Sequence, residues 1–230
     1  MRKATSLLFA LTLSLTTAQA QTTWKLSGDV RATNNEISFN QGSNGVWYFM
    51  ETASEAHIPS TYSFLPVYVA TCTGGIGEIP VIGLGCWRDI SLEPQHVPLV
   101  GVNFTSQPRQ GGNNVTVPPH AVWMHPAPAN LAIVAWKSPV FATVSVTGAF
   151  TDIDPACDNG ILWFIERGSQ RLASGAVPNG GAQSFNLPSV GVSPGQVLYF
   201  LVDANHGDFA CDSTMLDLTI VEVNLKRPSN

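Results

Sequence analysis

Aspartates gather in two short windows of the chain, a pattern that indicates cation binding. Seven of the nine fall there: Asp152, Asp154 and Asp158 in the first window, and Asp203, Asp208, Asp212 and Asp217 in the second. Neither window contains Lys or Arg, and Ca²⁺ binds through carboxylate oxygens. We therefore expect these residues, apart from Asp217, to be candidate Ca²⁺ ligands. The alternative is that they occupy turns for their own backbone hydrogen bonds, with Asp217 facing solvent from a strand.

One histidine, His206, has carboxylates beside it, from Asp203 and Asp208. A histidine in that setting can act as a general base, so one alternative is a hydrolase or lyase with its site in the 203–212 loop. No nucleophile or second acid stands at a readable spacing from it, and the pattern favours a non-catalytic protein. His206 is then a candidate ligand-binding residue.

The segment Gly191-Val192-Ser193-Pro194-Gly195 matches the G-x-S-x-G pattern of a hydrolase nucleophile elbow. That elbow needs a strand, a sharp turn and then a helix, whereas the residues that follow, 197–202, are typical of a strand. Pro194 also presets φ for a turn. We expect a hairpin-like connection here.

The chain has four cysteines, an even count that is typical of disulfides in an oxidising compartment. Of the three possible connectivities we favour Cys72 with Cys86 and Cys157 with Cys211. A metal site is disfavoured because there is no C-x-x-C pair and no His at a ligand-like spacing. The second bond would bring the two aspartate windows together.

Aromatic residues beside Gly-rich turns are candidates for sugar binding, because an exposed ring can stack on a sugar face. They are Trp47, Tyr48 and Trp87. The alternative is burial in the core, which large aromatics dominate. Trp136 and Trp163 lie in strand-like segments and are expected in the core.

The amino terminus is typical of a secretory signal peptide. Arg2 and Lys3 precede an apolar stretch over 7–15, and Ala18-Gln19-Ala20 forms an A-x-A cleavage site. The apolar stretch is shorter than the roughly 20 residues that span a bilayer. Residues 1–20 are therefore expected to be removed, and no membrane span is expected. The localisation would be secreted or periplasmic.

The chain has 230 residues, a net charge of −5 and only 12% charged residues. Loss of Arg2 and Lys3, with no acidic residue, would take the net charge to −7. This balance argues against nucleic-acid binding, and the sequence has neither the heptads of a coiled coil nor several membrane spans.

Period-two alternation predicts many short strands and an all-β fold, a jelly-roll-like antiparallel β-sandwich with long loops. We expect residues 21–230 to form a single domain, with 106–120 as a long surface loop. The strand candidates are 47–50, 62–70, 79–84, 99–104, 121–124, 140–150, 161–166, 197–202 and 216–220.

Several short motifs occur in an order that resembles a family of exported bacterial proteins. The motifs are Asn44-Gly45-Val46-Trp47-Tyr48, His125-Pro126, Trp136-Lys137-Ser138-Pro139, Asp158-Asn159-Gly160-Ile161, Gly195-Gln196-Val197-Leu198-Tyr199-Phe200 and Asp212-Ser213-Thr214. Over residues 44–222 the chain is similar to exported jelly-roll proteins, many of which have a PEP-CTERM sorting tail. That tail is missing here, and Ala127 and Gln196 depart from the family pattern. The resemblance implies a β-sandwich in an extracellular setting and no particular activity.

These observations lead to three functional hypotheses. The first is a secreted, non-catalytic β-sandwich that binds carbohydrate or cell-surface material and is stabilised by Ca²⁺. The second is a structural or adhesive envelope protein that binds protein partners. The third is the hydrolase or lyase described above.

Overall fold

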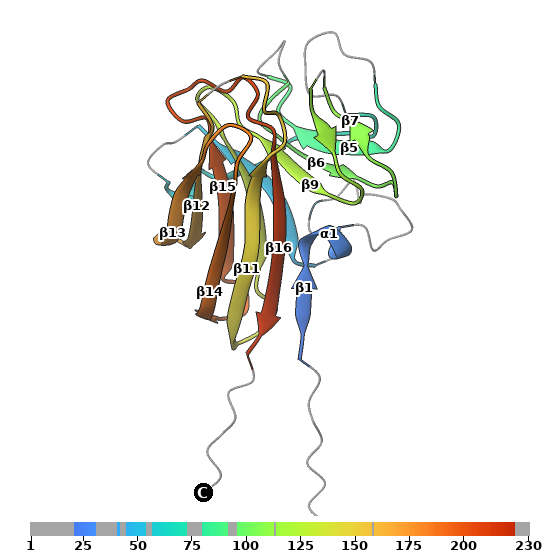
Figure 1. Cartoon of the computed structure of the whole chain (residues 1–230). Helices are drawn as coiled ribbons and strands as arrows, with labels where there is room; N and C mark the ends of the chain where they lie inside the picture. Colours follow the sequence, from blue (N-terminus) through green and yellow to red (C-terminus); the bar gives the residue numbers. More distant parts are fainter. Residues whose placement is uncertain are drawn as a thin grey trace, which may run out of the picture.

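The computed structural model describes residues 21–30, 41, 45–53, 57–72, 80–91, 96–112, 114–157 and 159–223. Two antiparallel sheets pack face to face, one of six strands and one of eight (Figure 1). This arrangement confirms the jelly-roll-like β-sandwich. No helix in these ranges is long and apolar enough to cross a membrane.

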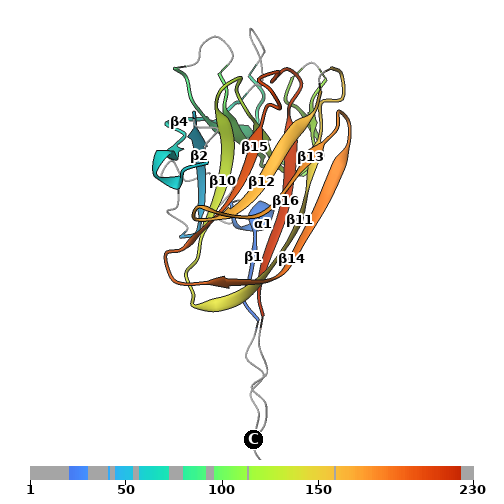
Figure 2. The ribbon, with the colours of Figure 1, turned by 90° about the vertical axis from the view of Figure 1, so that its left-hand side faces the viewer.

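The six-stranded sheet has the order β13-β12-β15-β10-β2-β3, and Figure 2 looks onto it from outside. Alternate side chains along its strands face the other sheet and the outside, with one register shift where Ile165 and Glu166 of β12 pair with β13. The strands are β2 (Trp47–Thr52), β3 (Ser63–Phe64), β10 (Leu131–Lys137), β12 (Ile161–Arg167), β13 (Gln170–Val177) and β15 (Val197–Asp203).

The eight-stranded sheet has the order β14-β11-β16-β9-β6-β5-β4, and β1 also pairs with β16. β16 pairs with β9 at Thr214 and Met215 and with β1 at 219–221. The four strands that follow this short pairing, β9, β6, β5 and β4, form the part of the sheet that we call the wing. The strands are β1 (Thr23–Lys25), β4 (Val67–Val69), β5 (Leu84–Arg88), β6 (Leu99–Asn103), β9 (Val122–His125), β11 (Ala142–Asp152), β14 (Ala182–Val192) and β16 (Thr214–Glu222).

Three small elements complete the fold. They are the helix α1 (Leu26–Asp29), the 3-10 helix η1 (Pro59–Thr61) and a separate hairpin of β7 (Arg109–Gln110) and β8 (Thr116–Val117). The hairpin lies inside the segment that we expected to be one long loop.

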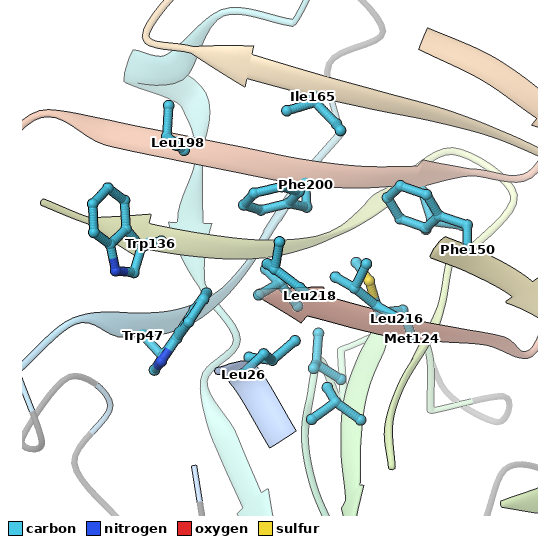
Figure 3. Packing of buried hydrophobic residues seen from close by; sticks show 14 of the residues in the cluster. Leu26, Trp47, Met124, Trp136, Phe150, Ile165, Leu198, Phe200, Leu216 and Leu218 are labelled. Carbon is cyan, nitrogen blue, oxygen red and sulfur yellow. The ribbon is translucent and has the colours of Figure 1, made fainter. Parts of the chain in front are cut away.

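The main core lies between the two sheets (Figure 3). Trp136 and Phe200 of the six-stranded sheet meet Phe150 and Leu218 of the other, and all four are fully buried. Leu26 of α1 enters the same core, next to Trp47. Burial of this apolar surface is the main favourable term in forming the sandwich.

A second core lies on the wing, beneath the β7–β8 hairpin. Its centre is Trp123, which is fully buried and lies over Gly101 of the neighbouring strand. A Cβ at position 101 would lie 2.3 Å from Trp123 Nε1, so only glycine fits beneath the indole. The disulfide between Cys72 and Cys86 is buried in this core.

The expected strands in the second half of the chain are present, and the G-x-S-x-G segment connects β14 to β15 through a turn, as predicted. The expected set lacks β1, β7 and β8, lacks β10 apart from the strand-like segment at Trp136, and lacks the two edge strands β13 and β14. Both lie at sheet edges with mostly exposed side chains, so they lack the regular apolar alternation that identified the others. The expected strand at 79–84 is wrong within its described residues, because β5 begins at Leu84.

Candidate functional site

The two aspartate windows do meet, at one end of the sandwich. Cys157 and Cys211 form the favoured disulfide, which joins residues 54 positions apart. Asn159 Nδ2 also donates to the Asn205 carbonyl over 2.9 Å. Both cysteine pairs therefore match the connectivity expected from the sequence.

Several carboxylates in these windows are engaged by backbone amides. Asp152 accepts from the Asp154 amide at 2.8 Å and from the Gly180 amide at 2.6 Å. Asp203 accepts from the Asn205 amide at 2.9 Å. Burial, and secondarily the charge of Asp152, raise the pKa of Asp154 above its ordinary value. These contacts are the turn hydrogen bonds of the alternative interpretation.

The remaining members of the windows are spread over different environments. Asp208 and His206 are exposed, Asp212 is buried, and Asp217 faces solvent from β16 as expected. Asp158 lies outside the described residues. In the part of the chain that the structure describes, no three His, Cys, Asp or Glu come together to hold a metal. The Ca²⁺ site stays a prediction from the sequence.

The expectation of exposed indole rings is wrong at Trp47 and Trp87. Their exposed fractions are 7% and 5%, and both belong to the main core. Trp47 Nε1 donates to Asp29 Oδ2 at 2.9 Å, a carboxyl whose pKa burial raises. Trp87 packs against Phe49 with ring centroids 4.8 Å apart.

Tyr48, the third expected aromatic, points the other way. It alternates with Trp47 and Phe49 along β2, so its ring lies on the outer face of the six-stranded sheet. There it is half-buried and stacks on Phe64 of the edge strand β3, with centroids 5.7 Å apart and an interplanar angle of 16°. Phe64 itself is 55% exposed.

Two rows of side chains cross this outer face at right angles to the strands. The register of the paired strands gives the first row as Arg171, Glu166, Tyr199, Ala135 and Tyr48. The second row is Ser174, Phe164, Leu201, Ile133, Met50 and Phe64. An outer sheet face normally carries polar residues, so this aromatic and apolar surface is unusual.

Part of the surface is covered by residues 57–62, which we call the strap. Tyr62 packs edge-on against Tyr199 at 4.9 Å between centroids, and His57 packs on Phe164 at 4.4 Å. Ile58 of the strap is 47% exposed. Phe64 and Tyr48 lie at the β2–β3 edge of the sheet, and Phe164 and Arg171 belong to β12 and β13.

A single buried carboxylate fastens the strap to the sheet. Glu166 is 2% exposed and accepts from the Tyr62 hydroxyl at 3.0 Å. Its other oxygen lies 2.8 Å from His57 Nδ1 and 3.4 Å from Arg171. Burial and the charge of Glu166 raise the pKa of Tyr62, so its hydroxyl stays protonated as the donor.

Arg171 completes this corner of the face. Its guanidinium carbon lies 4.4 Å from the centroid of the Phe164 ring, a cation–π arrangement. The side chain is nevertheless 47% exposed. The arrangement places flat aromatic faces beside polar hydrogen-bond donors.

Most of this surface was missed in the sequence. Glu166 has the same outward-facing parity as Leu162 and Phe164, and from the sequence a carboxylate at such a position is expected to be exposed to solvent. Its partners His57 and Tyr62 are 109 and 104 residues away in the chain. The one available signal was strand parity, which forbids Trp47 and Tyr48 from facing the same side.

A scan against protein-family models finds no match, and a search of the curated proteins finds none either. A search of solved structures finds carbohydrate-binding modules at low similarity. A CBM51 module from Clostridium perfringens, in complex with methyl-galactose, is 8% identical, covers 47% of this chain and 74% of that chain, and has a TM-score of 0.35. A CBM29-2 mutant with mannohexaose is 13% identical over 67% of this chain and 91% of that chain, with a TM-score of 0.33. A CBM36 module with calcium and xylotriose is 11% identical over 68% and 99%, with a TM-score of 0.30. At these scores the function has to be argued from the site itself.

Proposed function

We propose that the protein is an exported, non-catalytic β-sandwich that binds carbohydrate on the outer face of its six-stranded sheet. The observation that supports this most is the stacked pair of Tyr48 and Phe64, in which the outer ring is 55% exposed. An exposed phenylalanine backed by a second ring is a flat, fixed platform, and the apolar face of a pyranose packs on such a platform.

The surroundings of the pair fit the same ligand. Ile58 and Phe64 are two of the five exposed large hydrophobic residues of the described chain. Ile58 lies in the strap, and Phe64 lies in β3, which follows the strap in the sequence. The half-buried Met50 and Phe164 lie in the same row as Phe64. Phe64 and Met50 are paired across β2 and β3, so they place apolar surface together at this edge of the sheet, and exposed apolar surface marks binding sites.

The two disulfides support export, because such bonds persist in oxidising compartments. Glu166 has a positioning role in this proposal rather than a catalytic one. Its carboxylate is engaged by three side chains and is almost closed to solvent.

The test is affinity electrophoresis and pull-down on a panel of soluble and insoluble polysaccharides, with Phe64→Ala as the variant. Phe141→Ala is the matched control, because that ring is 84% exposed in the β10–β11 connection and outside both rows. We expect Phe64→Ala to weaken retention about tenfold, which corresponds to about 1.4 kcal/mol, and the control to change nothing. Silence of the whole panel, or equal binding by Phe64→Ala, would overturn the proposal.

The alternatives predict other results. Cross-linking to envelope proteins without polysaccharide binding would favour the adhesive role. Turnover of a glycoside, ester or peptide that is lost in Asp208→Asn would favour the hydrolase.

Calcium binding at the disulfide-linked loops is a separate proposal that rests on the sequence. A ligand that binds only the folded state at 100 times its Kd raises stability by about 2.7 kcal/mol. Added Ca²⁺ should therefore raise the melting temperature by several degrees and EDTA should reverse the rise. A melt that neither reagent changes would remove calcium from the account.

A further inference from the structure

The charged side chains of the six-stranded sheet are distributed unevenly between its buried and exposed positions. Its strands bear three acids, and none of them is exposed: Glu51 is 7% exposed, Glu166 is 2% exposed, and Asp203 is half-buried. They also bear three cations. Arg167 turns towards the other sheet, where it donates to the Gly191 carbonyl at 2.8 Å.

The two exposed charges on these strands are therefore both positive, Lys137 and Arg171. Lys137 follows Ala135 on the outward-facing positions of β10, and Arg171 begins the first row on β13. The strap adds only His57, which faces Glu166. The acids on the same face are buried Glu166, which Arg171 contacts at 3.4 Å, and half-buried Asp203. The exposed charges of the face are therefore positive, in a chain with a net charge of −5.

We propose that the ligand of this face is an acidic polysaccharide, one that bears carboxylates on its sugar units. The inference rests on the proposed function and names the chemical class of its ligand. The aromatic pair would hold a sugar face, and Lys137 and Arg171 would each meet a carboxylate. A guanidinium and an ammonium both form charge-assisted hydrogen bonds to carboxylates, and the guanidinium can do so through two N–H groups.

The spacing of the two cations requires an oligomer rather than a single sugar. β10 and β13 are separated by β15 and β12, and neighbouring strands lie about 4.8 Å apart, so the two side chains start about 14 Å apart across the sheet. A saccharide of several units spans that distance, whereas a monosaccharide reaches one cation at a time.

The inference is tested with polygalacturonate and with its methyl ester, which has the same backbone without the charge. We expect binding to the acid form, at least tenfold weaker binding to the ester, and loss of affinity as salt is raised, because exposed charges are screened. Lys137→Gln and Arg171→Gln should each weaken binding roughly threefold or more. Lys25→Gln is the control, since it removes one exposed cation from β1 in the other sheet.

Each outcome has a separate meaning. Equal binding of acid and ester, or an equal loss in Lys25→Gln, would overturn the acidic class. If a neutral polysaccharide binds and Phe64→Ala abolishes that binding, the proposed function stands and this inference fails. Silence towards every polysaccharide removes both. Arg171→Lys keeps the charge, so it separates loss of the cation from any disturbance of the contact with Glu166.

Discussion

The disulfide-linked loops and the outer face of the six-stranded sheet differ in where the partners of their acidic residues come from in the chain. In the loops the acids are adjacent in the sequence, yet the Asp152 carboxylate accepts from backbone amides. On the sheet the buried acid Glu166 is contacted by side chains from distant segments. Density of functional residues along the chain therefore says less about a site than the number of separate segments that meet there. The following predictions test this difference, from the largest expected effect to the smallest.

The loops should depend on their disulfide more than on any carboxylate. The bond between Cys157 and Cys211 closes a loop of 54 residues, and the bond between Cys72 and Cys86 closes one of 14. Chain entropy predicts losses of about 4 and about 3 kcal/mol when each pair is replaced by serine. Urea unfolding of the two double variants measures this. A smaller loss of stability for the Cys157–Cys211 double variant than for the Cys72–Cys86 double variant would contradict this prediction.

The sheet face should depend on one carboxylate. Glu166→Ala leaves the Tyr62 hydroxyl without its acceptor in a buried site, and we expect a loss of about 3 kcal/mol. That corresponds to a fall in Tm of roughly 6–12 °C for a domain of this size. Asp217→Ala, at an exposed acid of β16, is the control and should change stability by less than about 0.5 kcal/mol. Equal effects of the two variants would contradict a fastening role for Glu166.

The first aspartate window should contribute through its turns. Asp152→Ala removes the acceptor of two backbone amides, so we expect a loss of about 1–2 kcal/mol in the presence of EDTA. Thermal melts with EDTA and with Ca²⁺ separate the two interpretations. If Asp152→Ala is neutral in EDTA and instead abolishes a rise caused by Ca²⁺, the window is a metal site.

Asp154 should have the smallest effect, and one that depends on pH. Its pKa is raised in the folded state, first by burial and then by Asp152, so the ionised carboxylate destabilises the fold at neutral pH. Asp154→Asn should raise Tm at pH 7 by on the order of 1 °C. The gain should shrink as pH falls through the raised pKa and vanish below about 3.9, where both states are protonated. A gain that grows in acid would contradict this sign.

The fold could be predicted from the sequence wherever one strand face is buried. β11, β12 and β16 show regular alternation and β15 is a continuous apolar run, whereas the edge strands β13 and β14 show neither pattern. The cysteine pairing was predicted because Cys72 and Cys86 flank a Gly-rich loop, while Cys157 and Cys211 each stand in the tripeptide Ala-Cys-Asp. Of the residues in the proposed site, only Tyr48 was a ligand-binding candidate from the sequence. Its neighbour Phe64 lay inside an expected strand, and the contact of Glu166 with His57 depends on a register that no local pattern encodes.

The central claim is that ligand binds the outer face of the six-stranded sheet and not the disulfide-linked loops. Amide hydrogen exchange, measured with and without a saturating polysaccharide that the protein retains, tests it most directly. The account predicts slower exchange in β2, in residues 57–64 and in the first half of β13, with 152–160 and 203–212 unchanged. Protection confined to 152–160 and 203–212 would contradict it.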